Sequence, residues 1–143
     1  MDHIVYLDAK AKELENLLNG TKTMIIRGAM GRKLPYGRVN KGDVLYFMEN
    51  NGDGLVKAKA IVSDAFHSDK LSKEESLETV ENNMDALKLD NRLKKRFAGK
   101  RYLVLLSLTK VEKQEPFSID RSNYGNMDDW LPVEDVRTVR VSG

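Results

Sequence analysis

Residues 17–27 read Leu17-Leu18-Asn19-Gly20-Thr21-Lys22-Thr23-Met24-Ile25-Ile26-Arg27. Apolar residues recur at helical spacing up to Leu18, which predicts a short amphipathic helix with Asp8 as its N-cap and Gly20 as its C-terminal stop. Two β-branched isoleucines and a threonine then predict a strand over Thr23–Arg27. The stretch therefore joins a helix to a strand through a glycine, with a lysine at the junction and an arginine at the end of the strand.

Further strands are predicted on both sides of this junction. His3–Leu7 and Val44–Met48 are short apolar runs, and Leu55–Phe66 alternates apolar with polar residues, as in a strand with one buried face. Residues 49–54 form a strong hairpin-turn signal. Tyr102–Leu108 is almost wholly apolar, which is typical of a buried strand.

Two helices are expected between the last two of these strands. Ser72-Lys73-Glu74-Glu75 has the spacing of a capping box, and apolar residues follow on one helical face as far as Leu87. A second short helix is expected over Asp90–Phe97. Pro116–Ile119 and Val136–Val141 are weaker strand candidates.

Together these elements predict an α+β fold in which a helix packs at one end of a mostly antiparallel sheet. Many short strands with glycine-rich turns favour a β-barrel that carries an N-terminal helix and a helical insertion. At 143 residues the chain is expected to be one domain. No motif places residues 112–143, which are interpreted as a C-terminal extension specific to a subgroup.

The composition excludes several classes of chemistry. The chain has no cysteine, so disulfides, thiolate catalysis and cysteine-ligated metals are ruled out, and with only His3 and His67 no histidine-rich metal site is expected. No apolar run is long enough to span a bilayer and no export signal is evident, so we expect a cytoplasmic protein that needs no membrane and no cofactor.

A net charge of +2 conceals an uneven distribution of charge. Residues 74–90 are acidic, whereas residues 28–42 and 91–111 contain basic residues and no acid. The second basic block places Arg92, Lys95 and Arg96 on one face of the predicted helix, a pattern that also fits a solvated surface.

The glycine-rich segment 28–42 is the best candidate for contact with an anionic partner. Its charges, Arg32, Lys33, Arg38 and Lys41, would release counterions on binding a phosphate chain, and its glycines permit close approach of the backbone. Tyr36 could stack on an unpaired base. The alternative is a solvated loop. No Gly-Lys-Ser or Gly-Lys-Thr ends the segment, so it is not a P-loop.

The order of these motifs resembles the opening of ASCH domains, which are members of the PUA-like superfamily. Those domains have a helix ending in Leu-x-Gly-x-Lys-Thr, a strand ending in arginine, and a Gly-Asp before the next strand; Leu18–Thr23, Arg27 and Gly42-Asp43 correspond here. The resemblance covers residues 4–66 well and residues up to 108 more loosely. It implies a small PUA-like barrel and a role connected with RNA.

The resemblance also suggests which residues could act. One group of these domains, the acetylcytidine amidohydrolases, uses a lysine, a threonine and a glutamate. Lys22 matches the lysine, and Glu78 or Glu81 could supply the glutamate. The threonine position is occupied by Ile25, which has no hydroxyl.

Several residues keep a structural alternative. Lys22 either complements a helix dipole or reaches a cleft as a phosphate ligand or base, and Arg27 either forms a surface ion pair or binds phosphate. Trp130 is interpreted as a core or lid residue, or as a base-stacking residue in a pocket with Tyr124, Asn126, Asp128 and Asp129.

Three functions follow from these alternatives. The first is an RNA-binding module that uses Lys22, Arg27, Trp130 and the basic segment 28–42. The second is an enzyme acting on RNA or a modified nucleoside, amidohydrolase-like or ribonuclease-like, with Lys22 as base or nucleophile. The third is a protein-interaction surface formed by the acidic and basic helices.

Overall fold

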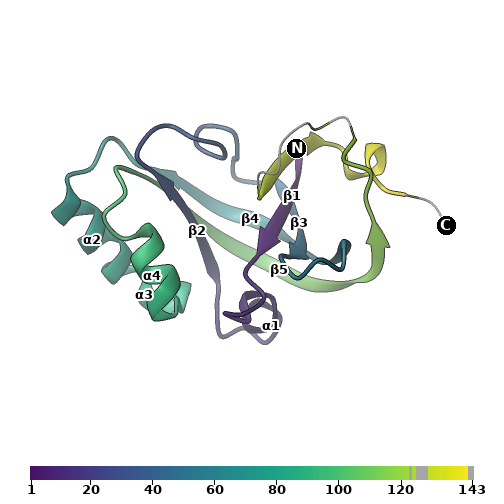
Figure 1. The fold of residues 1–143 in the computed structure, drawn as a ribbon, viewed down its shortest axis with the longest axis horizontal. Coiled ribbons are helices and arrows are strands. Elements are labelled where there is room, and N and C mark those ends of the chain that lie inside the picture. Colours follow the sequence, from purple (N-terminus) through teal and green to yellow (C-terminus); the bar gives the residue numbers. More distant parts are fainter. Residues whose placement is uncertain (123, 125–128, 142–143) are drawn as a thin grey trace.

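The structure is a computed structural model that describes residues 1–122, 124 and 129–141. A curled sheet forms its centre, three helices cover one end, and a separate helix closes the bottom in the view of Figure 1. In chain order the elements are β1 (Asp2–Leu7), α1 (Glu13–Leu18), β2 (Met24–Ala29), β3 (Val44–Glu49), β4 (Leu55–His67), α2 (Lys73–Asn82), α3 (Met84–Leu87), α4 (Asn91–Phe97), β5 (Tyr102–Ser118), β6 (Trp130–Glu134) and the 3-10 turn η1 (Val136–Thr138).

The six strands lie in the order β2-β5-β4-β3-β1-β6. Only β1 and β3 pair in parallel, and every other neighbouring pair in this sheet is antiparallel. The register between β4 and β5 shifts three times, and such bulges bend and twist a strand pair. The sheet therefore curls into a half-barrel with β2 and β6 as its edges, and the predicted α+β fold is confirmed.

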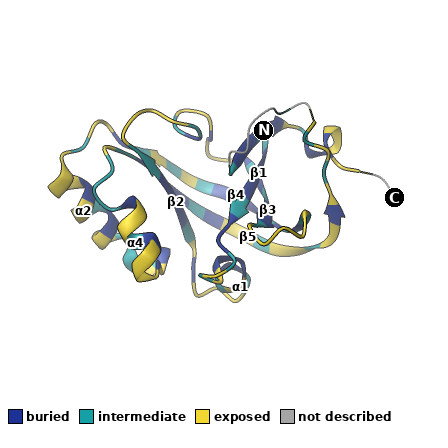
Figure 2. Cartoon of the chain, viewed as in Figure 1, coloured by how far each residue is buried: buried dark blue, intermediate teal, exposed yellow. Residues whose placement is uncertain are grey.

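Residues on the two faces of the sheet pack into separate clusters. Inside the curl, Ile25 of β2 packs with Phe47 and Trp130 in the largest cluster. Its neighbour Ile26 points the other way, into a cluster with Phe97 and the rest of the helical cover. In Figure 2 the buried residues accordingly follow the strands and the inner sides of α2 and α4. This alternation fixes the direction of every side chain on β2.

The start of the chain confirms one predicted boundary and corrects another. Asn19 ends α1, and Gly20 follows it at φ +81, the left-handed conformation that glycine adopts most easily. Asp8, however, is not the N-cap; that position belongs to Lys12. The Asp8 carboxylate instead accepts a hydrogen bond from the Ala11 amide at 2.8 Å, in the turn before the helix.

The C-terminal predictions needed larger corrections. β5 continues through Ser118 as a single strand, because its polar second half pairs with the start of β4. The strand predicted over Val136–Val141 is wrong. The Asp2 carboxylate accepts a hydrogen bond from the Val136 amide at 2.8 Å and that of Asp135 accepts one from the Arg137 amide at 2.9 Å, which stabilises a 3-10 turn.

The helical insertion begins as predicted and then divides. Both hydrogen bonds of the capping box join Ser72 and Glu75. Asn83 leaves helical geometry at φ −112 and separates α2 from α3. No helix in the described part of the chain has the length and apolar character needed to cross a membrane.

Candidate nucleic-acid interface

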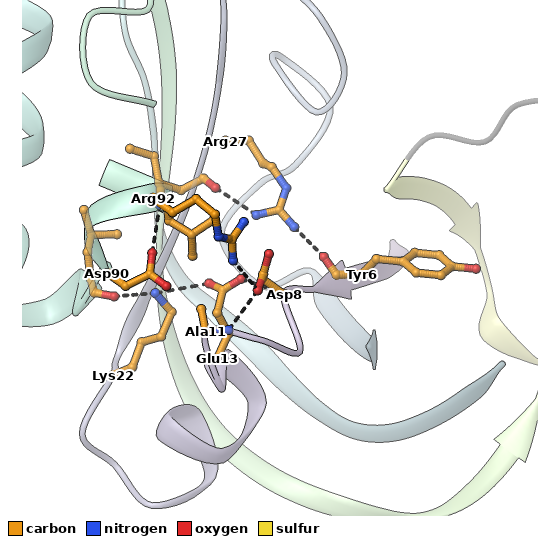
Figure 3. Close-up of polar contacts among 11 residues, drawn as sticks. Tyr6, Asp8, Ala11, Glu13, Lys22, Arg27, Asp90 and Arg92 are labelled. Carbon is orange, nitrogen blue, oxygen red and sulfur yellow. Dashed lines mark hydrogen bonds and ion pairs between the residues drawn. The ribbon is translucent and has the colours of Figure 1, made fainter. Parts of the chain in front are cut away.

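Lys22 lies inside the protein rather than on its surface. The residue is 1 % exposed. Its ammonium group donates a hydrogen bond to the carbonyl of Leu87, the last residue of α3, and forms an ion pair with Glu13 Oε2 at 3.3 Å (Figure 3). Lys22 therefore satisfies a carbonyl at the end of one helix and the carboxylate of another, which joins α1 to α3.

Burial governs the protonation of this lysine. Removal from water lowers the pKa of Lys22, and the negative charge of Glu13 offsets part of that change. Glu13 is thus the carboxylate beside Lys22. Of the two glutamates suggested by the family resemblance, Glu78 is exposed on α2 and Glu81 forms an ion pair with Lys94 at 2.5 Å.

A second ion pair lies close to this one. Glu13 Oε1 accepts a hydrogen bond from the Asp8 amide at 3.0 Å, and the Asp8 carboxylate binds Arg92 of α4 at 2.7 Å (Figure 3). The guanidinium of Arg92 holds the pKa of Asp8 below its usual value, against the opposing effect of burial. These contacts fix the corner between β1, α1 and α4.

Arg27 bridges the open side of the half-barrel. It comes from the edge strand β2, and its guanidinium donates to the Tyr6 carbonyl of β1 at 2.7 Å and to the Ile26 carbonyl at 2.8 Å (Figure 3). It also lies 5.6 Å from the centre of the Trp130 ring, a cation–π distance. The arginine is 8 % exposed and is held at a fixed position across the gap between strands.

One nitrogen of Arg27 lacks a hydrogen bond. Its Nε is buried and is 3.3 Å from Asp129 Oδ2, close enough for an ion pair but without hydrogen-bond geometry. The same carboxylate oxygen is 4.0 Å from Arg96 of α4. Two arginines from distant parts of the chain therefore share one loosely held carboxylate.

Two small hollows meet at these three residues. The first, about 60 Å³, is bounded by β2, the segment 28–42 and α4; the second, about 40 Å³, extends toward Asp8 and Glu13. Both are lined by Arg27, Arg96, Phe97 and Asp129. The two hollows therefore adjoin at these four residues and together form one cleft.

The glycine-rich segment is tied to the sheet beside the first hollow. The Tyr36 hydroxyl donates to the Ser68 carbonyl at 2.6 Å. His67 accepts from the Gly37 amide at 3.1 Å, and its other ring nitrogen lies 2.8 Å from the Val39 carbonyl. These hydrogen bonds hold the segment against the end of β4 and so fix the position of its backbone.

The predicted basic residues of this segment occupy different positions. Lys33 and Tyr36 line the first hollow together with Tyr102. Arg32 is exposed and lies over the rings of Tyr36 and Tyr102, 6.0 and 5.6 Å from their centres. Arg38 is exposed and is not among the residues that line the hollow.

Trp130 is a core residue, one of the alternatives left open by the sequence. It is fully buried, and its Nε1 donates to His3 Nδ1 at 3.0 Å. His3 Nε2 in turn lies 2.8 Å from Asp43 Oδ2. The ring presents no exposed face to a base, and Asn126 and Asp128, suggested as its neighbours, lie outside the described residues.

The structure thus brings Arg27, Lys33 and Tyr36 into one cleft and leaves Lys22 and Trp130 in the interior. Arg96 and Tyr102 join the cleft, although the sequence had not singled them out for it. The one sequence signal for Arg96 was its position on a basic helical face, and that pattern does not reveal which strand the helix covers. Among the described residues, no group of three histidine or acidic side chains could hold a metal ion.

Comparison with known proteins identifies the fold. No protein-family model and no curated protein sequence matches the chain. Solved structures of ASCH from Zymomonas mobilis do match. One mutant of that protein has a TM-score of 0.68 at 12% identity, with 96% of this chain and 91% of the other covered. The structure described simply as ASCH has a TM-score of 0.64 at 13% identity, covering 93% and 89%. The chain is similar to these proteins in fold.

Proposed function

We propose that this chain, with its ASCH-like fold, is an RNA-binding module whose cleft binds the backbone of a single strand. The observation that carries the proposal is the convergence of Arg27, Lys33 and Arg96 on one cleft. They come from β2, the glycine-rich segment and α4, and guanidinium groups suit phosphate oxygens well.

The surroundings of the cleft support a strand rather than a lone ion. Tyr36 and Tyr102 line it beside the cations, and aromatic rings next to a basic groove are typical of proteins that bind single strands. The exposed Arg32 and Arg38 lie on the same segment and extend the positive charge beyond the cleft. The family resemblance favours RNA over DNA.

Neutralising the exposed charges of the segment tests this proposal. The variant Arg32→Gln/Lys33→Gln/Arg38→Gln is compared with Lys10→Gln/Lys110→Gln/Lys113→Gln, which removes the same charge from exposed residues outside the cleft lining. Binding of a single-stranded RNA is measured at several salt concentrations. We expect the first variant to bind more weakly, with a salt slope lower by about 0.7 for each phosphate that the protein no longer neutralises.

The outcome separates specific from general attraction. If both triple variants weaken binding equally, net charge explains the effect and the cleft does not. If the segment variant binds as the unchanged protein does, the proposal is wrong.

The second candidate is an enzyme acting on RNA or a modified nucleoside. The observation that favours it is the Lys22–Glu13 pair, because Glu13 lines the smaller hollow and burial lowers the pKa of Lys22. A lysine of this kind can act as a base when it is neutral. Lys22 itself does not line either hollow, so substrate would have to approach through Glu13.

This candidate is tested by incubating the protein with acetylated cytidine and with short RNAs, and then repeating the assay with Glu13→Gln. Turnover that is lost in this variant supports the enzyme. If neither compound is converted, both activities are excluded.

A further inference from the structure

The geometry points to a phosphate-binding subsite between Arg27 and Arg96 that the Asp129 carboxylate occupies in the absence of ligand and vacates when a phosphate group binds. The inference rests on the proposed function and adds that the Asp129 carboxylate competes with phosphate for the two arginines. It assigns to Asp129 a role opposite to that of a ligand-binding residue.

The first argument is the incomplete bonding of Arg27. Two of its terminal N–H groups are satisfied by carbonyls, which fixes the plane of the guanidinium, whereas the buried Nε–H has no hydrogen bond. A buried donor without a partner is costly. A phosphate oxygen in line with Nε would supply the missing bond, which the Asp129 carboxylate at 3.3 Å does not.

The second argument is the loose hold on Asp129. Its contacts to the two arginines, at 3.3 and 4.0 Å, use one and the same oxygen. Its side chain is 43 % exposed, so it can move into water without a large desolvation cost. Arginine–carboxylate pairs are frequently bidentate, and neither arginine makes such a pair with Asp129.

The third argument is the shape of the cleft. Each hollow is too small for a nucleoside, since ligand pockets usually enclose about 300–1,000 Å³. A volume of about 60 Å³ has room for roughly four water-sized groups, which is comparable to a phosphate. Arg27, Arg96 and Asp129 line both hollows, so the departure of the Asp129 carboxylate leaves both arginines facing space that a phosphate group can occupy.

The occupant must therefore be a compact dianion or monoanion with several acceptor oxygens. A phosphate group fits this description, whether it belongs to an RNA strand or is free in solution. A carboxylate in the subsite repels such a group, and like charges placed together cost binding energy. Phosphate binding then exchanges one anion for another, so the Asp129 carboxylate weakens the apparent affinity of the subsite for phosphate.

Calorimetric titration with inorganic phosphate tests the subsite apart from any RNA. The variant Asp129→Asn is compared with the unchanged protein and with Asp85→Asn, which removes the same charge from an exposed position on α3. We expect Asp129→Asn to bind phosphate about tenfold more tightly and Asp85→Asn to bind it as the unchanged protein does. Adding Arg96→Gln to Asp129→Asn should abolish the gain.

Equal affinity of Asp129→Asn and Asp85→Asn overturns the inference. Should Asp129→Asn fail to fold, the variant Arg96→Gln alone decides. It should bind phosphate more weakly than the unchanged protein does, and equal affinity overturns the subsite. Phosphate is then replaced by single-stranded RNA. If phosphate binding changes as expected but no variant binds RNA, the subsite stands and the RNA proposal is refuted. If the protein binds RNA and Asp129→Asn and Asp85→Asn bind it equally well, the RNA proposal stands and the subsite is refuted.

Discussion

Lys22 lies just before β2 and Arg27 lies within it, yet the two residues have different surroundings. Both are buried cations, and each contacts a carboxylate and a main-chain carbonyl. Lys22 is enclosed by α1 and α3 and lines neither hollow of the cleft. Arg27 lies beside both hollows with one donor unpaired. Burial and a nearby carboxylate are therefore common to both residues, and what differs is the unpaired Nε donor of Arg27 beside open space, on which its proposed role rests.

The difference predicts the largest effect for Lys22→Met. Removing one partner of a buried ion pair leaves the other charge unpaired, and Glu13 would also face the unsatisfied Leu87 carbonyl. We expect the free energy of unfolding to fall by about 3–5 kcal/mol in urea titrations. Lys33→Met, at an exposed position in the cleft, is the matched control and should change stability little.

A second variant shows whether charge is the cause. Adding Glu13→Leu to Lys22→Met removes the unpaired carboxylate and should recover part of the lost stability. If Lys22→Met is as stable as the unchanged protein, the pair does not join α1 to α3, and the contrast with Arg27 fails.

Arg96→Gln should show the opposite behaviour. Its side chain is 57 % exposed, so its loss should change the free energy of unfolding by less than about 0.5 kcal/mol. Affinity for single-stranded RNA should fall about tenfold, the size expected for one charged hydrogen bond. Lys94→Gln, on the same helix but outside the cleft lining, serves as the control in the filter-binding assay. A loss of stability with unchanged binding would place Arg96 in the structural class with Lys22.

The buried surroundings of Arg27 can be tested by changing the pH, because Trp130 packs against both Arg27 and the titratable His3. Burial lowers the pKa of His3, although the Asp43 carboxylate, and more weakly Asp2, oppose the shift while the N-terminal amine adds to it. The neutral ring also accepts the Trp130 N–H, which a protonated ring could not do.

The sign follows from linkage. Since the folded protein holds this proton less tightly than the unfolded chain, the contribution of His3 to stability is full above the ordinary value of 6.5 and declines as the pH falls below it. Asp43, whose pKa is also lowered, adds a further loss in more acidic solution. Urea unfolding at pH 7.5 and pH 5.5, followed by the fluorescence of Trp130, measures the slope. His3→Leu should flatten it, and a steeper or reversed slope contradicts this account.

Elements that depend on local interactions could be predicted from the sequence, whereas elements that depend on non-local pairing could not. Gly20 and the Ser72 capping box were predictable because neighbours within a few residues determine them. The polar middle of β5 was not, since its pairing with β4 is non-local; only its end had been predicted, as part of the strand candidate Pro116–Ile119. The edge strand β6 was missed as well, and it contains Pro132, which an edge strand tolerates. In the cleft, Arg27 could be selected because it follows two apolar residues and directly precedes the basic segment, although β2 continues to Ala29 rather than ending at Arg27. Arg96 could not, because it reaches the cleft only when α4 packs over β2.

The smallest effect is expected for Arg92→Gln, on the same helix as Arg96. Arg92 binds the Asp8 carboxylate at 2.7 Å, but its side chain is half exposed and water can replace the carboxylate. We expect a slight decrease in the midpoint of thermal unfolding and no change in RNA affinity. Asp8→Asn should lower the midpoint further, because Asp8 also accepts the Ala11 amide. Equal loss of RNA binding in Arg92→Gln and Arg96→Gln would mean that the whole basic face of α4, rather than Arg96 alone, contacts the strand.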